Sequence, residues 1–94
     1  MRSKVRIHVA GRVQGVGFRY MTKMVADQLQ IGGSVKNESD GSVTILATGE
    51  EQAMATFIQK VKHSPSPAGR VTHFELTEEN ELPDYSSFQV VYEY

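Results

Sequence analysis

Residues 4–29 read KVRIHVAGRVQGVGFRYMTKMVADQL, and this segment decides the fold. Alternate residues from Val5 to Val9 are apolar, which predicts a strand with one buried face. Residues 11–17 contain three glycines and predict a loop. From Phe18 onward apolar residues recur at helical spacing, and the glycine pair 32–33 is expected to end that helix. The expected apolar stripe of the helix is Phe18, Met21, Val25 and Leu29.

The rest of the chain shows the same two periods. Ser39-Asp40-Gly41 is a strong turn signal between two short strands. Thr48 and Glu51 have the spacing of a capping box, so a second helix is expected to begin there. The further expected elements are strands at 35–37 and 43–47, a helix through Met54, Phe57, Ile58 and Val61, a strand at 71–76, an acidic loop at 77–86 and a closing strand from Phe88 to Tyr94.

This element order, βαββαβ with an extra final strand, predicts an α+β fold. The economical arrangement is a ferredoxin-like split βαβ sandwich, with two helices packed on one face of a mostly antiparallel sheet. Lys4, Arg6 and His8 would then lie on the opposite face, which water can reach. The chain has 94 residues, the size of one domain, so 1–94 is expected to form a single unit.

Charge and cysteine content exclude several kinds of site. Ten Lys and Arg against eleven Asp and Glu give a net charge of −1, whereas proteins that wrap nucleic acid usually carry a basic excess. Residues 1–26 hold six basic side chains and no acid, and the chain after Arg70 holds six acids and no Lys or Arg. The absence of cysteine excludes disulfides and thiolate ligands. With no signal-peptide pattern and no apolar run that could span a membrane, we expect a cytoplasmic protein.

The loop before the first helix has features of an anion site. Gly15 and Gly17 allow backbone angles that turn successive N–H groups inward. No Ser, Thr, Asp or Asn directly precedes the helix to cap it, so its free N–H groups are available to an anion. Arg19 in the first turn opposes the helix dipole unless an anion binds there. Two glycines can equally serve loop geometry alone, and the spacing does not decide between these readings.

Two nucleotide-binding patterns do not fit this loop. No Gly-Lys-Ser or Gly-Lys-Thr follows, as the Walker A pattern requires. The third glycine of a dinucleotide fingerprint is replaced by Tyr20. An RNA-binding sheet is also disfavoured, because the open face of the first strand carries no aromatic residue.

Two blocks of sequence together resemble one known family. Residues 11–19, GRVQGVGFR, resemble the acylphosphatase pattern G-x-V-Q-G-V-x-F-R. Residues 33–43, GSVKNESDGSV, resemble that family's G-x-V-x-N-x-x-D-G-x-V. The spacing of the blocks, the element order and the length agree with a small stand-alone acylphosphatase, so the resemblance covers essentially the whole chain.

The resemblance implies hydrolysis of the carboxyl-phosphate bond of an acyl phosphate, without metal, cofactor or covalent intermediate. Arg19 and Asn37 would be the catalytic residues, Arg19 holding the phosphate and Asn37 orienting the water. A phosphate oxygen would accept the water's proton. The phosphate-binding residues would be Gln14, Gly15, Val16, Gly17, Phe18 and Arg19.

The same resemblance implies the partners. They are a small-molecule acyl phosphate and inorganic phosphate, the latter as product and inhibitor, with no nucleic acid and no membrane. A monomer is the simple expectation. The alternative within the family is a phosphate-binding module that is non-catalytic or handles carbamoyl phosphate.

The chain departs from the family pattern at two positions. Ser34 and Gln30 stand where members of the family commonly have Trp and Gly, and we expect looser packing beneath the second strand. Among other residues, Asp40 is assigned a turn role. Arg12 is interpreted as solvated or as a loop anchor, with a second phosphate ligand as the alternative. His8, His63 and His73 lie on different predicted elements without metal-ligand spacing, and Tyr92 and Tyr94 are interpreted as sheet packing.

Overall fold

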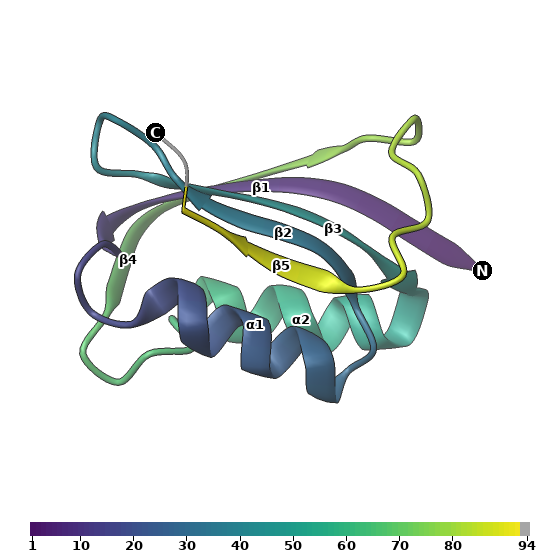
Figure 1. Ribbon diagram of the computed structural model, residues 1–94, viewed down its shortest axis with the longest axis horizontal. Coiled ribbons are helices and arrows are strands. Elements are labelled where there is room, and N and C mark those ends of the chain that lie inside the picture. Colours follow the sequence, from purple (N-terminus) through teal and green to yellow (C-terminus); the bar gives the residue numbers. More distant parts are fainter. Residues whose placement is uncertain (93–94) are drawn as a thin grey trace.

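The computed structural model describes residues 1–92 as one sheet with two helices on one of its faces (Figure 1). The expected element order is confirmed, including the extra final strand. The elements are β1 (Arg2–Arg12), α1 (Phe18–Gln28), β2 (Gly32–Asn37), β3 (Val43–Glu50), α2 (Glu51–Lys62), β4 (Arg70–Glu78) and β5 (Phe88–Val91). Of the closing strand, Tyr94 lies outside the described residues.

The sheet is antiparallel except at one edge, and its strand order is β4-β1-β3-β2-β5. β1 pairs with β3 and β4, and β2 pairs with β3, all antiparallel. β5 runs parallel to β2, with Val90 opposite Val35. The ferredoxin-like sandwich is therefore confirmed. It brings the ends of β1, β2 and β5 to the same end of the sheet.

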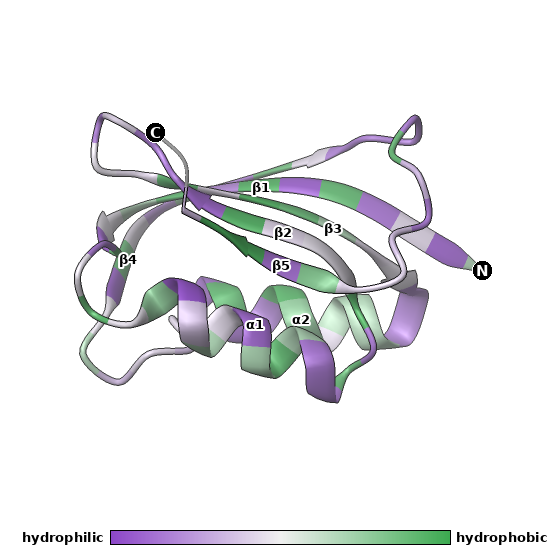
Figure 2. Cartoon of the chain, viewed as in Figure 1, coloured by the Kyte–Doolittle hydropathy of each residue, from purple (hydrophilic) through white to green (hydrophobic). Residues whose placement is uncertain are grey.

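The core lies between the helices and the sheet. Val5, Ile7 and Val9 are buried while Arg6 is exposed on the other face, so β1 alternates as predicted (Figure 2). Phe57 of α2 meets Phe88 of β5 edge to face, with 6.0 Å between the ring centroids. This contact attaches the short edge strand to the core.

The buried stripe of α1 differs from the predicted one. Phe18, Thr22 and Ala26 are buried, whereas Met21 and Val25 are only half-buried at the flanks. The buried residues follow one another at intervals of four, which places them on one side of the helix. A threonine in the core cannot be identified from hydropathy, and the prediction therefore chose the larger apolar neighbours.

The end of α1 was also predicted too late. Gln30 has a φ of 57° and donates its N–H to the Asp27 carbonyl at 3.2 Å, while the Ile31 N–H donates to the Ala26 carbonyl at 2.8 Å. These two bonds form a Schellman motif, in which the residue after the C-cap is left-handed. The expected ending at the glycine pair 32–33 is wrong, because both glycines begin β2.

The predicted capping box of α2 does not form. Thr48 is buried in β3, and its hydroxyl accepts a hydrogen bond from the Tyr85 N–H at 3.2 Å. The N-cap of α2 is Glu50, which makes no side-chain capping bond. Because β3 continues up to the start of α2, Thr48 lies within the strand, and its hydroxyl does not cap the helix.

Asp84, from the acidic loop, pairs with two basic residues at the start of β1. Asp84 lies 3.3 Å from Arg2 Nε and 3.9 Å from Lys4 Nζ. The Asp84 side chain remains 60% exposed in these pairs and therefore stays on the solvated surface. These exposed pairs stabilise the fold by about 0–1 kcal/mol each.

Candidate functional site

The loop between β1 and α1 presents a helix N-terminus without a side-chain cap. Gly15 has a φ of 74°, and Gly17, the N-cap, has a φ of 78°. A Cβ at either glycine would meet nothing within 4 Å, so glycine is needed there for the backbone angle and not for space. The first backbone N–H groups of α1 have no partner within the helix. Their direction and the helix dipole favour an anion.

Hydrogen bonds with two other loops hold this segment in place. Gln14 Nε2 donates to the carbonyls of Glu38 and Ser42, each at 2.8 Å. On the other side, Ser66 Oγ donates to the Val16 carbonyl at 2.6 Å. The loop is therefore fixed to the β2–β3 turn and to the segment after α2. Gln14 acts here as an anchor through its side chain.

Arg19 is oriented by the chain at the end of β5. Its Nη1 donates to the Val91 carbonyl at 2.8 Å. Its Cζ lies 5.0 Å from the centroid of the Tyr92 ring, within the range of a cation–π contact. A carbonyl and an aromatic face thus position the guanidinium, which has further N–H groups for an anion.

Asn37 is the last residue of β2, at the same end of the sheet. Its Oδ1 is buried, and among residues 1–92 it has no hydrogen-bond donor. An amide oxygen buried in this way costs about 1–3 kcal/mol. The acceptor capacity of this amide oxygen is therefore unused within residues 1–92.

These parts meet at one cavity of about 150 Å³. This is smaller than the ~300–1,000 Å³ of pockets for drug-sized ligands and suits a small anion. Within the described residues 1–92, Arg19 is the one charged side chain of its lining. The lining consists of Val13, Gly15, Gly17, Phe18, Arg19, Tyr20, Asn37, Val90 and Tyr92.

The predicted site residues divide into two groups. Gly15, Gly17, Phe18, Arg19 and Asn37 line the cavity together, although they come from two separate segments. The other two predicted phosphate-binding residues, Gln14 and Val16, do not line the cavity. They hold the loop in place instead: the Gln14 side chain donates hydrogen bonds, and the Val16 carbonyl accepts one.

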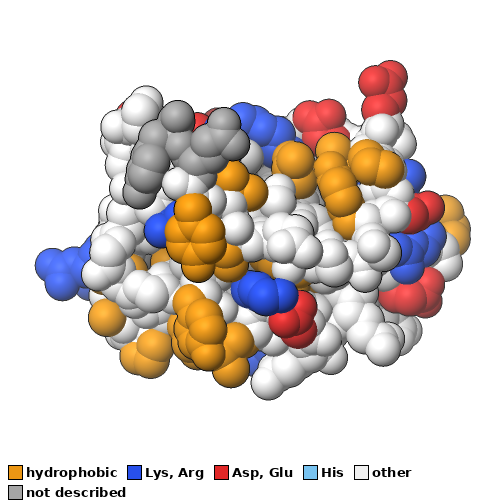
Figure 3. Space-filling model, in the orientation of Figure 1, with side chains coloured by type: hydrophobic (Ala, Val, Ile, Leu, Met, Phe, Trp, Pro, Cys, Tyr) orange, Lys and Arg blue, Asp and Glu red, His pale blue; other side chains and the backbone are white. Residues whose placement is uncertain are grey.

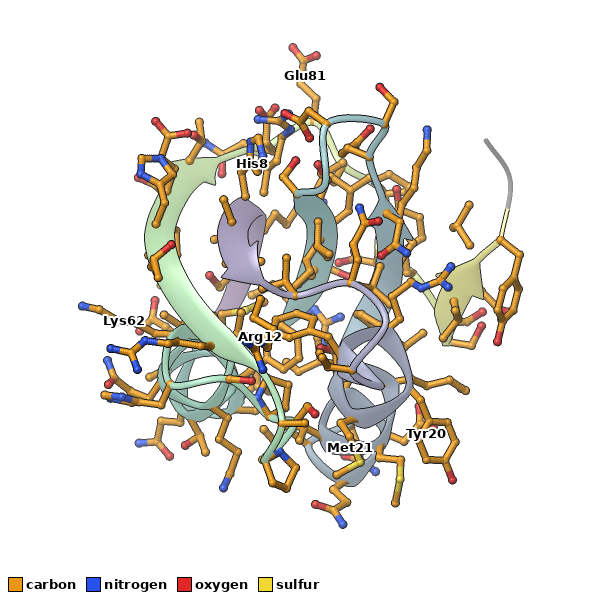
Figure 4. The ribbon with its side chains drawn as sticks, turned by 90° about the vertical axis from the view of Figure 1, so that its left-hand side faces the viewer. His8, Arg12, Tyr20, Met21, Lys62 and Glu81 are labelled. Carbon is orange, nitrogen blue, oxygen red and sulfur yellow. The ribbon has the colours of Figure 1, made fainter. Side chains whose placement is uncertain are left out.

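Sequence reasoning missed two aromatic residues of the site. Tyr20 and Tyr92 line the cavity and are 63% and 73% exposed. The interpretation of Tyr92 as sheet packing is wrong, because it lies beyond the end of β5 and contacts Arg19. The signal for Tyr20 was its place next to Arg19, and no pattern pointed to Tyr92. Figure 4 views this end of the sheet, with Tyr20 pointing outward from α1 and Arg12 lying toward β4.

Asp40 has the turn role that was predicted. Its Oδ1 accepts hydrogen bonds from Ser42 Oγ at 2.6 Å and from the Ser42 N–H at 3.0 Å. The bond from the hydroxyl, followed by that from the N–H, lowers the pKa of the Asp40 carboxyl below its ordinary value. Since the Ser42 carbonyl also holds Gln14, this turn supports the loop.

The described part of the chain contains neither a cluster of metal ligands nor a membrane-spanning helix. Within residues 1–92, no three His, Asp or Glu side chains are grouped as metal ligands would be. In the same part of the chain, neither helix is long and apolar enough to cross a membrane.

Comparison with known proteins places the chain among close relatives. The family model described as Acylphosphatase matches residues 5–90. An acylphosphatase of Enterococcus faecalis is 60% identical over 94% of this chain and 97% of its own length. The crystal structure of acylphosphatase from Bacillus subtilis superimposes with a TM-score of 0.90 at 47% identity, covering 98% of this chain and 100% of the other. Full-length HypF, in a phosphate- and nucleotide-bound form, matches with a TM-score of 0.87 at 30% identity over 97% of this chain and 12% of its own.

Proposed function

This chain belongs to the acylphosphatase family, and from that premise we propose how its residues hydrolyse an acyl phosphate. Arg19 and the loop of residues 14–18 bind the phosphoryl group, and Asn37 orients the attacking water. The observation that carries the proposal is that Arg19 and Asn37 line one cavity at the start of α1.

Phosphoryl binding follows from the charges at the start of α1. The substrate's phosphoryl oxygens are anionic, and both the helix dipole and the Arg19 guanidinium are positive toward the cavity. Phosphoryl transfer through a loose transition state requires mainly positioning and charge stabilisation. The contacts of Arg19 with the Val91 carbonyl and Tyr92 supply that positioning before the substrate arrives.

Asn37 acts on the water. Its side-chain amide holds the water by hydrogen bonding, and the water oxygen then attacks phosphorus. The bond between phosphorus and the acyl oxygen breaks, and the carboxylate leaves with the bonding electron pair. Both hydrogens of the water end on the phosphate, one of them passing to a phosphoryl oxygen. The products are a carboxylate and dihydrogen phosphate, so atoms and charge balance.

The proposal is tested by assaying a synthetic acyl phosphate in the presence of excess chelator. We expect hydrolysis that the chelator does not reduce, and competitive inhibition by inorganic phosphate, because the product retains the phosphoryl oxygens. Dependence on an added metal would contradict the mechanism. No turnover by well-folded protein that still binds phosphate would favour the phosphate-binding module.

Two further properties are part of the proposal. The protein is expected to act in the cytoplasm and as a monomer. Cell fractionation tests the first property, and light scattering coupled to size-exclusion chromatography tests the second. A dimer mass across the assay's concentration range would contradict the monomer.

A further inference from the structure

We propose that Tyr20 and Tyr92 form the acyl-binding wall of the active site and select acyl phosphates with uncharged aliphatic or aromatic acyl groups. The inference rests on the proposed function, since it assigns the half of the substrate that remains after the phosphoryl group is placed at the loop and Arg19. It concerns specificity and leaves the chemical step unchanged.

Neither tyrosine is part of the hydrophobic core. Tyr20 follows Arg19 in the first turn of α1, and Tyr92 follows the last residue of β5. They are 63% and 73% exposed, yet both line the cavity. Two large aromatic side chains from different elements thus stand at the mouth of one small cavity. Aromatic rings offer much contact area and lose little conformational freedom on binding.

The charge of the cavity lining favours an uncharged acyl group. Among residues 1–92, Arg19 is the one charged side chain that lines the cavity, and the phosphoryl group uses it. Of the other lining side chains, Val13, Phe18 and Val90 are apolar, and Asn37 is polar but uncharged. A carboxylate carried on the acyl group would lose its hydration on binding and would find no positive side chain to pair with. An aliphatic or aromatic group would instead leave water for the tyrosine rings.

Tyr92 connects the two halves of the site. Its ring contacts the Arg19 guanidinium at 5.0 Å while the ring remains largely exposed. Figure 3 shows hydrophobic side chains gathered beside a basic group over the start of α1 and the end of β5. The same surface therefore offers a positive point for the phosphoryl group and apolar area for its neighbour in the substrate.

The first test compares hexanoyl phosphate with acetyl phosphate, which have the same leaving-group chemistry and different chain lengths. We expect wild-type kcat/KM to favour hexanoyl phosphate by about tenfold, since partial burial of the added methylenes gives roughly that gain. Tyr20→Ala should lower this preference about threefold or more. Inhibition by inorganic phosphate should not change, because the variant keeps the backbone N–H. Met24→Ala is the matched control: Met24 lies one turn further on, is 39% exposed and does not line the cavity.

Tyr92 needs a readout that separates its two contacts. Tyr92→Phe keeps the ring and should keep the hexanoyl preference, whereas Tyr92→Ala should lose it. If Tyr92 acted through Arg19 alone, Tyr92→Ala would lower kcat/KM for both substrates equally and weaken phosphate inhibition. That result would overturn its role in the acyl wall.

A rigid substrate pair tests the preference for an uncharged group. 4-Methylbenzoyl phosphate and 4-carboxybenzoyl phosphate have similar shapes and differ in one charge. We expect the methyl compound to have a several-fold higher kcat/KM in the wild type and a smaller advantage in Tyr20→Ala. Equal rates for both pairs in the wild type would overturn the inference and leave the proposed function intact. Failure of folded protein to hydrolyse any of the four compounds would instead contradict the proposed function.

Discussion

Arg19 is the residue on which phosphate binding depends most. Arg19→Ala should lower kcat/KM by about 10³-fold or more and weaken phosphate inhibition, as for other arginines that clamp a phosphoryl group. Arg19→Lys should also lose much of the activity, because an ammonium cannot replace the planar guanidinium fork. Steady-state kinetics with inorganic phosphate as inhibitor measure both effects.

Arg12 provides the control for that experiment. It is exposed and does not line the cavity, so Arg12→Ala should keep both kcat/KM and the inhibition constant of phosphate. A comparable loss in Arg12→Ala would show that the basic charge of the loop matters and not the place of Arg19.

Gly17 tests the backbone geometry of the anion site. Its φ of 78° suits glycine, and a Cβ there would meet no atom within 4 Å. Gly17→Ala should therefore lower the free energy of unfolding by about 1–2 kcal/mol through backbone strain alone. Urea unfolding measures this cost. A loss well above it would mean that the loop packs more tightly than the structure shows.

At the scale of single residues, the sequence predicted some members of the site and missed others. Arg19 and Asn37 lie in patterned segments, and the structure brings them to one cavity. Tyr92 was missed because its partner Arg19 lies 73 positions away along the chain, and only the parallel pairing of β5 with β2 brings them together. Thr22 was missed because burial of a threonine depends on which neighbour faces it.

At the scale of elements, the backbone at the end of α1 is strained, and a single substitution should relieve that strain. Gln30 occupies the left-handed position of the Schellman motif, where glycine is favoured. The departure at Gln30 thus acts at the helix end, while Ile31 and Val35 beside it remain buried. Gln30→Gly should raise the free energy of unfolding by about 1 kcal/mol, measured in urea. Met24→Gly, at a partly exposed position in the middle of the helix, is the opposite control and should destabilise by about 1 kcal/mol.

The β2–β3 turn and the loop are coupled elements. Gln14→Ala removes two hydrogen bonds to the Glu38 and Ser42 carbonyls, which keep their backbone donors, and should cost about 0.5–1.5 kcal/mol for each bond. Gln52→Ala, at an exposed position of α2, should change the free energy of unfolding little. If both variants unfolded at the same urea concentration, the anchoring role of Gln14 would be wrong.

The same turn gives a pH dependence of defined sign. Hydrogen bonds from Ser42 lower the folded-state pKa of Asp40, so the carboxylate's contribution is present above its ordinary value of 3.8 and is lost as the pH falls through the lowered pKa. Asp40→Asn should therefore remove a small part of the acid sensitivity below about pH 4. Urea midpoints at pH 7 and pH 3 test this, and an unchanged difference between the two pH values in the variant would contradict it.

For the whole molecule, the edge strand β5 links stability to the site. Phe88 is buried against Phe57, and the same strand carries the carbonyl that orients Arg19. Phe88→Ala should cost about 3–5 kcal/mol of unfolding free energy. Because β5 is attached by few residues, activity should fall at temperatures below global unfolding, which parallel activity and circular-dichroism melts would reveal. Coincident melts would contradict this coupling.

The architecture could be predicted because its signals are local. Alternation in β1, helical spacing after Phe18 and the Asp40-Gly41 turn each depend on a few neighbouring residues. The strand order and the parallel pairing of β5 depend on contacts between distant segments, which no window of sequence contains. The predicted cap of α2 failed for the same reason, because the Thr48 hydroxyl accepts a hydrogen bond from the N–H of Tyr85, a residue distant in the sequence.

The central claim is that binding and water positioning are divided between Arg19 and Asn37. The most direct test measures kcat and the inhibition constant of inorganic phosphate for Asn37→Ala, with the exposed Asn80→Ala as control. The account predicts that kcat falls by about 10²-fold or more in Asn37→Ala while phosphate inhibits as in the wild type. An unchanged kcat, or abolished phosphate inhibition in a folded Asn37→Ala, would contradict it.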